Sequence, residues 1–110
     1  MSPERRIRLG DVFAALGDPT RRQLIDWMSR EGSGTATGFA RRLPITRQAV
    51  ARHLKELEEA GVVTSRKQGR QTVFTLETEA LAKAALWLEK RSDAWDRTLD
   101  RLKRHVEEGT

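Results

Sequence analysis

Apolar residues in the first third of the chain recur with the 3.6-residue period of amphipathic helices. The first predicted helix spans residues 9–16 and ends at Gly17. Its apolar side consists of Leu9, Val12, Phe13 and Leu16. Asp18 can cap a second helix, which has Pro19 at its first position and runs to about Ser29. The chain is therefore expected to begin with two helices joined by a short turn.

The next segment contains the only stretch that looks flexible, residues 31–35, which is rich in glycine. Residues 37–43 follow and predict a short third helix. Pro44 favours a boundary at that point, because the residue before a proline disfavours the helical conformation. A tight turn to the next helix is therefore expected here.

The fourth predicted helix is strongly amphipathic. Thr46 can cap it, and its apolar positions repeat at steps of four and three. They are Val50, Leu54 and Leu57. Winding the helix at about 100° per residue places polar residues on the opposite side, free to meet a partner. That side comprises Gln48, Ala51, Arg52 and Lys55, with Arg47 near the start.

After Gly61 the pattern changes to the β-branched and apolar residues typical of strands. Residues 62–67 and 72–76 predict a hairpin with a cationic tip, and a long last helix runs from about Glu79 to Glu107. The predicted fold class is mainly α with a small β-hairpin, in the order α-α-α-α-β-β-α. With 110 residues, a single domain over residues 1–110 is expected.

The net charge of the chain sits in its middle third. Residues 41–70 contain eight Lys and Arg against three Asp and Glu, whereas the remaining residues contain 13 of each sign, and the whole chain carries +5. A cationic patch that coincides with a helix and a hairpin able to enter a groove favours nucleic-acid binding.

Composition excludes several other functions. The chain has no cysteine, so disulfides, thiolate metal sites and a cysteine nucleophile are excluded. It has no Gly-rich phosphate loop, nucleophile elbow or acid pair near a histidine, so neither an enzyme nor a cofactor is expected. Without an apolar run of ~18 residues or a secretory leader, a cytoplasmic location is expected. Hydrophobic content of 37% is low for a monomer and favours a homodimer.

The order of elements is that of a winged helix-turn-helix, whose recognition helix lies in the major groove of DNA. Arg can pair with guanine and Gln with adenine, so the predicted recognition-helix contacts are Thr46, Arg47, Gln48, Ala51, Arg52 and Lys55. The hairpin is more suited to phosphate or minor-groove contacts. Its candidates are Arg66, Lys67 and Arg70, with Arg41 and Arg42 at the edge.

Three segments resemble the ArsR/SmtB family of bacterial winged helix-turn-helix repressors: residues 16–22, residues 46–63 with the run AVARHLKELEEAGVV, and Gly69-Arg70 in the wing. The resemblance covers nearly the whole chain and implies a compact dimeric repressor that blocks its operator. It gives His53 a packing or backbone hydrogen-bonding role. Two-fold symmetry predicts an inverted repeat with half-sites about 34 Å apart, or a multiple of that distance.

Metal-sensing members of that family use cysteines on the short helix before the recognition helix, or His and Asp/Glu ligands on the last helix. This chain has residues 36–40 without a thiol at the first place. On the last helix His105, Glu108 and Asp93 match only part of the second pattern, and Trp95 stands where a second imidazole would be needed. We expect no metal site, and the effector is unknown; a metal-responsive repressor using the last helix remains an alternative.

The last helix is too long to be covered by so small a domain. Its apolar residues alternate steps of four and three, as in helices that pack at a shallow angle. The positions of this stripe, all apolar except Ser92, are Leu81, Ala85, Leu88, Ser92, Trp95, Leu99, Leu102 and Val106. The part from Leu81 to Leu88, with Trp87, can pack on its own domain. The expected dimer interface comprises Trp95, Leu99, Leu102 and Val106, joined by Leu9, Val12, Phe13 and Leu16.

A winged-helix protein-interaction module is the other alternative, because the same faces can be reused to bind a protein. It would have an apolar or acidic recognition face, and Arg47, Arg52 and Lys55 argue against it. A charged face can also be merely solvated, and a basic hairpin tip can simply protect an edge strand. Duplex RNA is disfavoured because its deep, narrow groove would not admit the helix.

Overall fold

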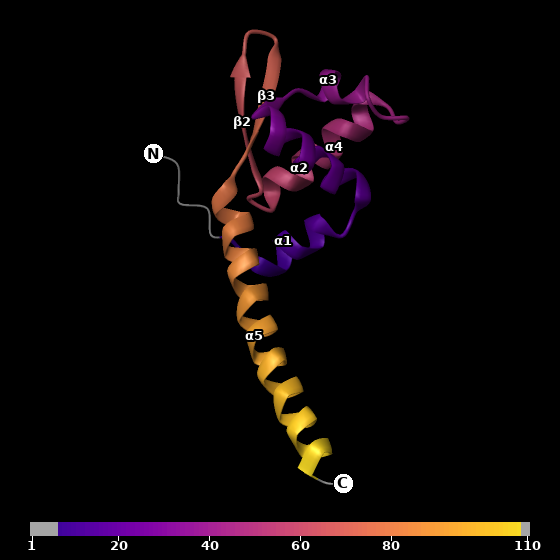
Figure 1. The fold of residues 1–110 in the computed structure, drawn as a ribbon. Helices are drawn as coiled ribbons and strands as arrows, with labels where there is room; N and C mark the ends of the chain where they lie inside the picture. Colours follow the sequence, from indigo (N-terminus) through magenta and orange to yellow (C-terminus); the bar gives the residue numbers. More distant parts are fainter. Residues whose placement is uncertain (1–6, 109–110) are drawn as a thin grey trace.

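The computed structural model describes residues 7–108, which form helices, a three-stranded antiparallel sheet and one long terminal helix (Figure 1). The elements are α1 (Leu9–Leu16), α2 (Pro19–Glu31), β1 (Ser33–Gly34), α3 (Ala36–Ala40), α4 (Arg47–Glu59), β2 (Val63–Gln68), β3 (Gln71–Leu76) and α5 (Thr78–Glu108). The molecule measures 70 × 38 × 20 Å. The long dimension arises because α5 extends far beyond the other elements (Figure 1).

Three of the helices begin at side chains that accept a backbone N–H three residues later. Asp18 Oδ2 accepts from the N–H of Arg21 at 3.0 Å and starts α2. Thr46 Oγ1 accepts from the N–H of Ala49 at 3.1 Å and starts α4. Both caps were predicted and are confirmed, because a short polar side chain before an apolar periodic run satisfies N–H groups that the helix leaves free.

The first and fourth helices have the predicted extents, whereas α2 and α3 differ. The second helix continues two residues beyond Ser29. Thr35 caps the third helix, which ends at Ala40, so the prediction that it reaches residue 43 is wrong. After Ala40 the chain turns, and the N–H of Arg42 donates to the carbonyl of Phe39 at 2.9 Å.

The stretch expected to be flexible forms a strand instead. Ser33 pairs with Thr75, and Gly34 with Phe74, which makes β1 the third strand of the sheet in the order β1-β3-β2. A Cβ on Gly34 would lie 2.1 Å from Cζ of Phe39. The glycine is therefore needed for close approach to an aromatic ring, which the sequence pattern did not distinguish from a flexible linker.

The predicted hairpin is confirmed. Three of its four strand ends lie one residue away from the expected positions, and β3 ends at Leu76 as expected. The β2–β3 register runs from Val63 opposite Leu76 to Gln68 opposite Gln71. The two-residue turn places Gly69 at φ +64°, which glycine adopts without strain. Beyond Val63 every residue of β2 is exposed, so this wing projects from the body of the molecule.

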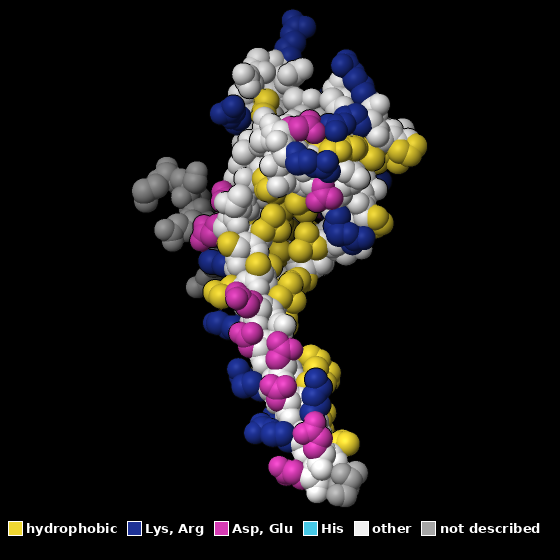
Figure 2. Space-filling view, in the orientation of Figure 1, with side chains coloured by type: hydrophobic (Ala, Val, Ile, Leu, Met, Phe, Trp, Pro, Cys, Tyr) yellow, Lys and Arg dark blue, Asp and Glu magenta, His cyan; other side chains and the backbone are white. Residues whose placement is uncertain are grey.

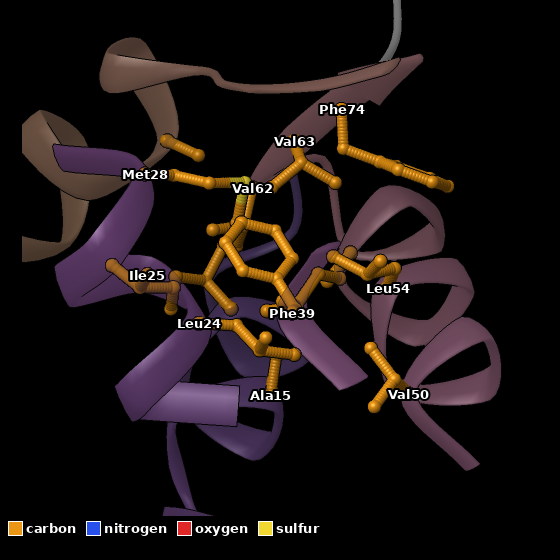
Figure 3. Close-up of a cluster of buried hydrophobic side chains, with 14 of the residues drawn as sticks. Ala15, Leu24, Ile25, Met28, Phe39, Val50, Leu54, Val62, Val63 and Phe74 are labelled. Carbon is orange, nitrogen blue, oxygen red and sulfur yellow. The ribbon is translucent and has the colours of Figure 1, made fainter. Parts of the chain in front are cut away.

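A core of apolar side chains holds α1, α2, α3, α4 and the sheet together (Figure 3). The apolar side of α4 is fully buried, with Val50, Leu54 and Leu57 each 0% exposed. Val12 is also 0% exposed within its own protomer. The prediction that Val12 belongs to a dimer interface is therefore wrong, because it offers no surface to a second chain.

The first third of α5 packs on the domain, and the rest does not. Ala80 and Ala84 are buried, and the Trp87 ring meets that of Phe13 edge to face at a centroid distance of 5.5 Å. The expectation that the apolar stripe packs on its own domain as far as Leu88 is wrong, because Leu88 is 52% exposed. In the described part of the chain, no helix combines the length and apolar character needed to cross a membrane.

Candidate nucleic-acid interface

The outer face of α4 is open to solvent along its whole length. All six side chains of the predicted recognition-helix set are exposed: Thr46, Arg47, Gln48, Ala51, Arg52 and Lys55. The buried stripe of Val50, Leu54 and Leu57 fixes which side of the helix faces outward. The helical period therefore identified both faces of α4 from the sequence.

Arg47 does more than face outward, because its Nε donates to Oγ1 of Thr37 at 3.0 Å. This bond joins the start of α4 to the start of α3, the two helices of the helix-turn-helix. Among the described residues the other two guanidinium nitrogens of Arg47 have no hydrogen-bond partner, so they are open to another acceptor. Thr37 had not been recognised as part of the site, since no local pattern links residues ten positions apart across a turn.

A stack of flat groups fixes the short helix α3. The rings of Trp27 and Phe39 are stacked at 5.8 Å with an interplanar angle of 14°, and the Arg42 guanidinium lies 4.0 Å from the centroid of the Trp27 ring. Nη1 of Arg42 donates to both carboxylate oxygens of Glu31 at 2.9 Å. Arg42 is thus engaged in an intramolecular contact, which reduces the charge that it can offer to a phosphate.

The wing carries exposed cations. Within residues 7–108, the side chains of Arg66, Lys67 and Arg70 form neither a hydrogen bond nor an ion pair. Figure 2 shows Lys and Arg side chains around the hairpin end of the molecule, whereas α5 carries both signs of charge. Oγ of Ser65 donates to Oε2 of Glu58, which ties the wing to α4. The wing and α4 therefore form one connected surface.

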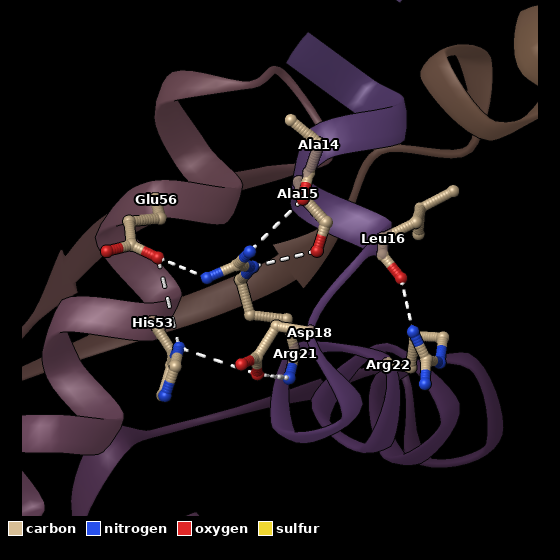
Figure 4. Close-up of polar contacts among 8 residues, drawn as sticks. All are labelled: Ala14, Ala15, Leu16, Asp18, Arg21, Arg22, His53 and Glu56. Atoms are coloured by element: carbon tan, nitrogen blue, oxygen red, sulfur yellow. Dashed lines mark hydrogen bonds and ion pairs between the residues drawn. The ribbon is translucent and has the colours of Figure 1, made fainter. Parts of the chain in front are cut away.

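A polar cluster lies behind α4, between that helix and the turn joining α1 to α2 (Figure 4). Here the backbone N–H of Arg21 lowers the pKa of Asp18 below its ordinary value of 3.8, and the positive fields of His53 and Arg21 act in the same direction, against the opposing effect of burial. His53 Nδ1 is buried and lies 3.9 Å from Asp18 Oδ2 and from Glu56 Oε2. His53 therefore faces the protein interior and not the outer face of α4.

Metal ligands do not gather anywhere in the described residues. Among residues 7–108, no group of three or more His, Asp and Glu side chains is arranged to hold a metal ion. Asp93, His105 and Glu108, which echo a metal-sensing pattern, lie on the exposed part of α5.

Comparisons with known proteins identify the same elements. Residues 16–66 match a family model described as a helix-turn-helix domain. Two similar proteins of Bacillus subtilis are an uncharacterised HTH-type transcriptional regulator, YuzN, and the transcriptional repressor SdpR. The first is 42% identical over 64% of this chain and 83% of the relative, and the second is 30% identical over 73% and 88%. An ArsR-like transcriptional regulator from Rhodococcus sp. RHA1 has a TM-score of 0.74 and 40% identity over 87% of this chain and 90% of that chain.

Proposed function

Because the chain belongs to the ArsR family of helix-turn-helix transcriptional regulators, we propose that it is a homodimeric repressor that binds an inverted-repeat operator in duplex DNA. Members of this family are DNA-binding regulators and not enzymes. The observation that carries the proposal is the exposed polar face of α4 beside a wing with unneutralised cations. Such a protein would act in the cytoplasm, where bacterial DNA lies.

Sequence selection is assigned to the first two turns of α4. Arg47 and Arg52 present guanidinium donors that fit the O6 and N7 atoms of guanine, and the Gln48 amide fits the N6 and N7 atoms of adenine. Each good bidentate pair contributes about 1 to 3 kcal/mol of discrimination. The short side chain of Ala51 lies between these donors on the same face and allows close approach of the helix to the bases.

Affinity without sequence choice is assigned to the remaining cations. Arg66, Lys67 and Arg70 on the wing, together with Lys55 and Arg41, can each neutralise a phosphate and release a counterion. Each such contact steepens the dependence of binding on salt by about 0.9 in the logarithmic slope. Arg42 contributes less in this proposal because Glu31 already holds its guanidinium.

Dimerisation is assigned to the distal stripe, which we define as Trp95, Leu99, Leu102 and Val106. These side chains are 59%, 36%, 53% and 65% exposed and repeat at steps of four, three and four along one side of α5. A row of large apolar side chains left open to water favours a second copy of the chain as its cover. Leu9, Phe13 and Leu16 of α1, which are partly buried, are proposed to complete the interface.

The first experiment measures fluorescence anisotropy of a labelled duplex from the gene's own upstream region, and of a scrambled duplex, across a salt series with and without Zn²⁺. We expect tight, salt-steep binding that prefers the upstream duplex and is indifferent to zinc. Failure to bind either duplex would favour a protein-interaction module. Release of the upstream duplex by zinc would favour a metal-responsive repressor that uses His105 and its neighbours on α5.

A further inference from the structure

One arginine side chain joins two helices that have different functions in the proposed repressor. The Arg21 guanidinium donates from Nε to the carbonyl of Ala15 at 2.7 Å and from Nη2 to the carbonyl of Ala14 at 3.1 Å (Figure 4). Its third nitrogen, Nη1, forms an ion pair with Oε2 of Glu56. A single planar group thus holds the end of α1 and the inner side of α4 at the same time.

The hydrogen bonds of Arg21 restrict the relative orientation of the helices as well as their separation. The last carbonyls of a helix have no partner within it and carry a partial negative charge, so a guanidinium is a favourable cap there. Hydrogen bonds that involve charged groups are stronger than neutral ones. The Arg21 side chain is 17% exposed and that of Glu56 is 43% exposed, so water reaches the ion pair mainly from the Glu56 side. Apolar packing alone would resist separation of the helices but would resist rotation less.

The position of the Glu56 carboxylate depends on Arg21, because His53 offers that carboxylate an alternative partner. His53 Nδ1 is buried without a hydrogen-bond partner among the described residues, and Oε2 of Glu56 lies 3.9 Å from it. That oxygen is the one that Arg21 holds. Without Arg21 the carboxylate can turn to His53, but both belong to α4, so the new contact would not replace the polar link from Glu56 to the end of α1.

The two connected helices set the geometry of the proposed dimer. Through the ring contact of Phe13 with Trp87, α1 packs on α5, which carries the distal stripe. The outer face of α4 is assigned to the DNA. In a two-fold dimer, the angle of α4 relative to α1 and α5 determines the distance between the two recognition helices, which must match the spacing of the half-sites.

We infer that Arg21 is a positioning residue for operator binding, which couples the α1 and α5 side of the protomer to the recognition helix. Its role is to fix the separation of the two recognition helices and not to contact DNA. The inference rests on the proposed function. It assigns the selection of half-site spacing to a residue of α2 that contacts the inner side of α4, which faces away from the bases.

The test compares Arg21→Gln with Arg22→Gln. Arg22 also caps α1, with Nη1 2.6 Å from the carbonyl of Leu16, but it is exposed, and within residues 7–108 its side chain forms no hydrogen bond or ion pair with α4. The probes are two duplexes selected by the wild-type protein from a random pool: the full inverted repeat and a single half-site. Binding is measured by anisotropy, the fold by circular dichroism, and the dimer by analytical ultracentrifugation.

We expect Arg21→Gln to remain folded and dimeric, to lose about tenfold affinity for the inverted repeat and to keep its affinity for the half-site within about twofold, since changes in coupling networks of this kind have effects of that size. Arg22→Gln should match the wild type on both duplexes. Glu56→Gln should resemble Arg21→Gln, and the double variant should be no worse than either, because both changes remove one link.

Equal losses on the inverted repeat and the half-site would overturn the inference, and so would a loss of the same size in Arg22→Gln. If Arg21→Gln does not fold, Glu56→Gln, which replaces the carboxylate with a neutral amide of the same size and so removes the ion pair, carries the same comparison. The proposed function fails separately, when the wild-type protein selects no duplex from the pool.

Discussion

The helices α4 and α5 carry apolar stripes with the same spacing but opposite exposure. On α4 the stripe of Val50, Leu54 and Leu57 is 0% exposed, whereas on α5 the distal stripe is 36% to 65% exposed. Spacing therefore reveals which side of a helix is apolar but not what covers it. The stripe of α4 is covered by its own protomer, and the stripe of α5 is the one that we propose a second copy covers.

The largest effect is expected for the stripe of α4, which is buried within its own protomer. Replacing Leu54 with Ala should lower the free energy of unfolding by about 2 to 5 kcal/mol, because it leaves a cavity in the buried core. Urea unfolding followed by circular dichroism at fixed protein concentration measures the loss. Lys55→Ala, one residue further on the exposed side, is the matched control and should change stability by less than about 0.5 kcal/mol. Similar values for both variants would remove the distinction between the two sides of α4.

A substitution in the distal stripe of α5 should separate the protomers and leave each one folded. Leu99→Glu should weaken the dimer by about 1.5 to 3 kcal/mol per protomer, the value of burying one leucine, and should yield monomers in analytical ultracentrifugation at micromolar concentration. Leu86→Glu introduces the same residue at another exposed leucine of α5, about 140° away round the helix, and should leave the dimer intact. An intact Leu99→Glu dimer would place the interface elsewhere.

The outer side of α4 is exposed like the distal stripe, but it is polar. Substitutions on this side should therefore change DNA binding alone. Arg52→Ala should reduce the discrimination between operator and scrambled duplex by about 1 to 3 kcal/mol, because it removes one proposed base contact. Anisotropy titrations of both duplexes measure the difference. Arg70→Ala, on the wing, should weaken both complexes together and reduce the salt slope by about one. If Arg52→Ala weakens both complexes to the same extent, it does not read bases.

The helices α4 and α5 also show how much of the structure could be predicted from the sequence. The fold class, the caps at Asp18 and Thr46 and both faces of α4 follow from local rules, in which one residue type and its near neighbours decide the outcome. The strand at Gly34 depends on the ring of Phe39, and its glycine has no local signal that separates close packing from flexibility.

The contacts that escaped prediction join residues distant along the chain. Arg21 reaches Glu56 across 35 positions, and Arg42 stacks on Trp27 while holding Glu31. A charged residue on a helix surface has many possible partners, and periodicity does not select among them. For the same reason the sequence assigned Arg42 to the DNA edge, although the structure engages it within the protomer.

The smallest expected effect concerns the polar support behind α4, where Asp18 caps α2 and faces His53. Because the folded state lowers the pKa of Asp18, the ionised carboxylate favours folding, so its contribution is complete above the ordinary value of 3.8 and is lost as pH falls through the lower folded value. Asp18→Ala should lose about 1 kcal/mol near neutral pH, the usual cost of removing a helix cap. Asp18→Asn keeps a cap that does not titrate, so its deficit relative to the wild type should shrink between about pH 6 and pH 3. Urea unfolding followed by tryptophan fluorescence at both pH values measures that difference. A deficit that stays constant with pH would mean that the charge of Asp18 adds no stability beyond that of its hydrogen bond to the Arg21 N–H.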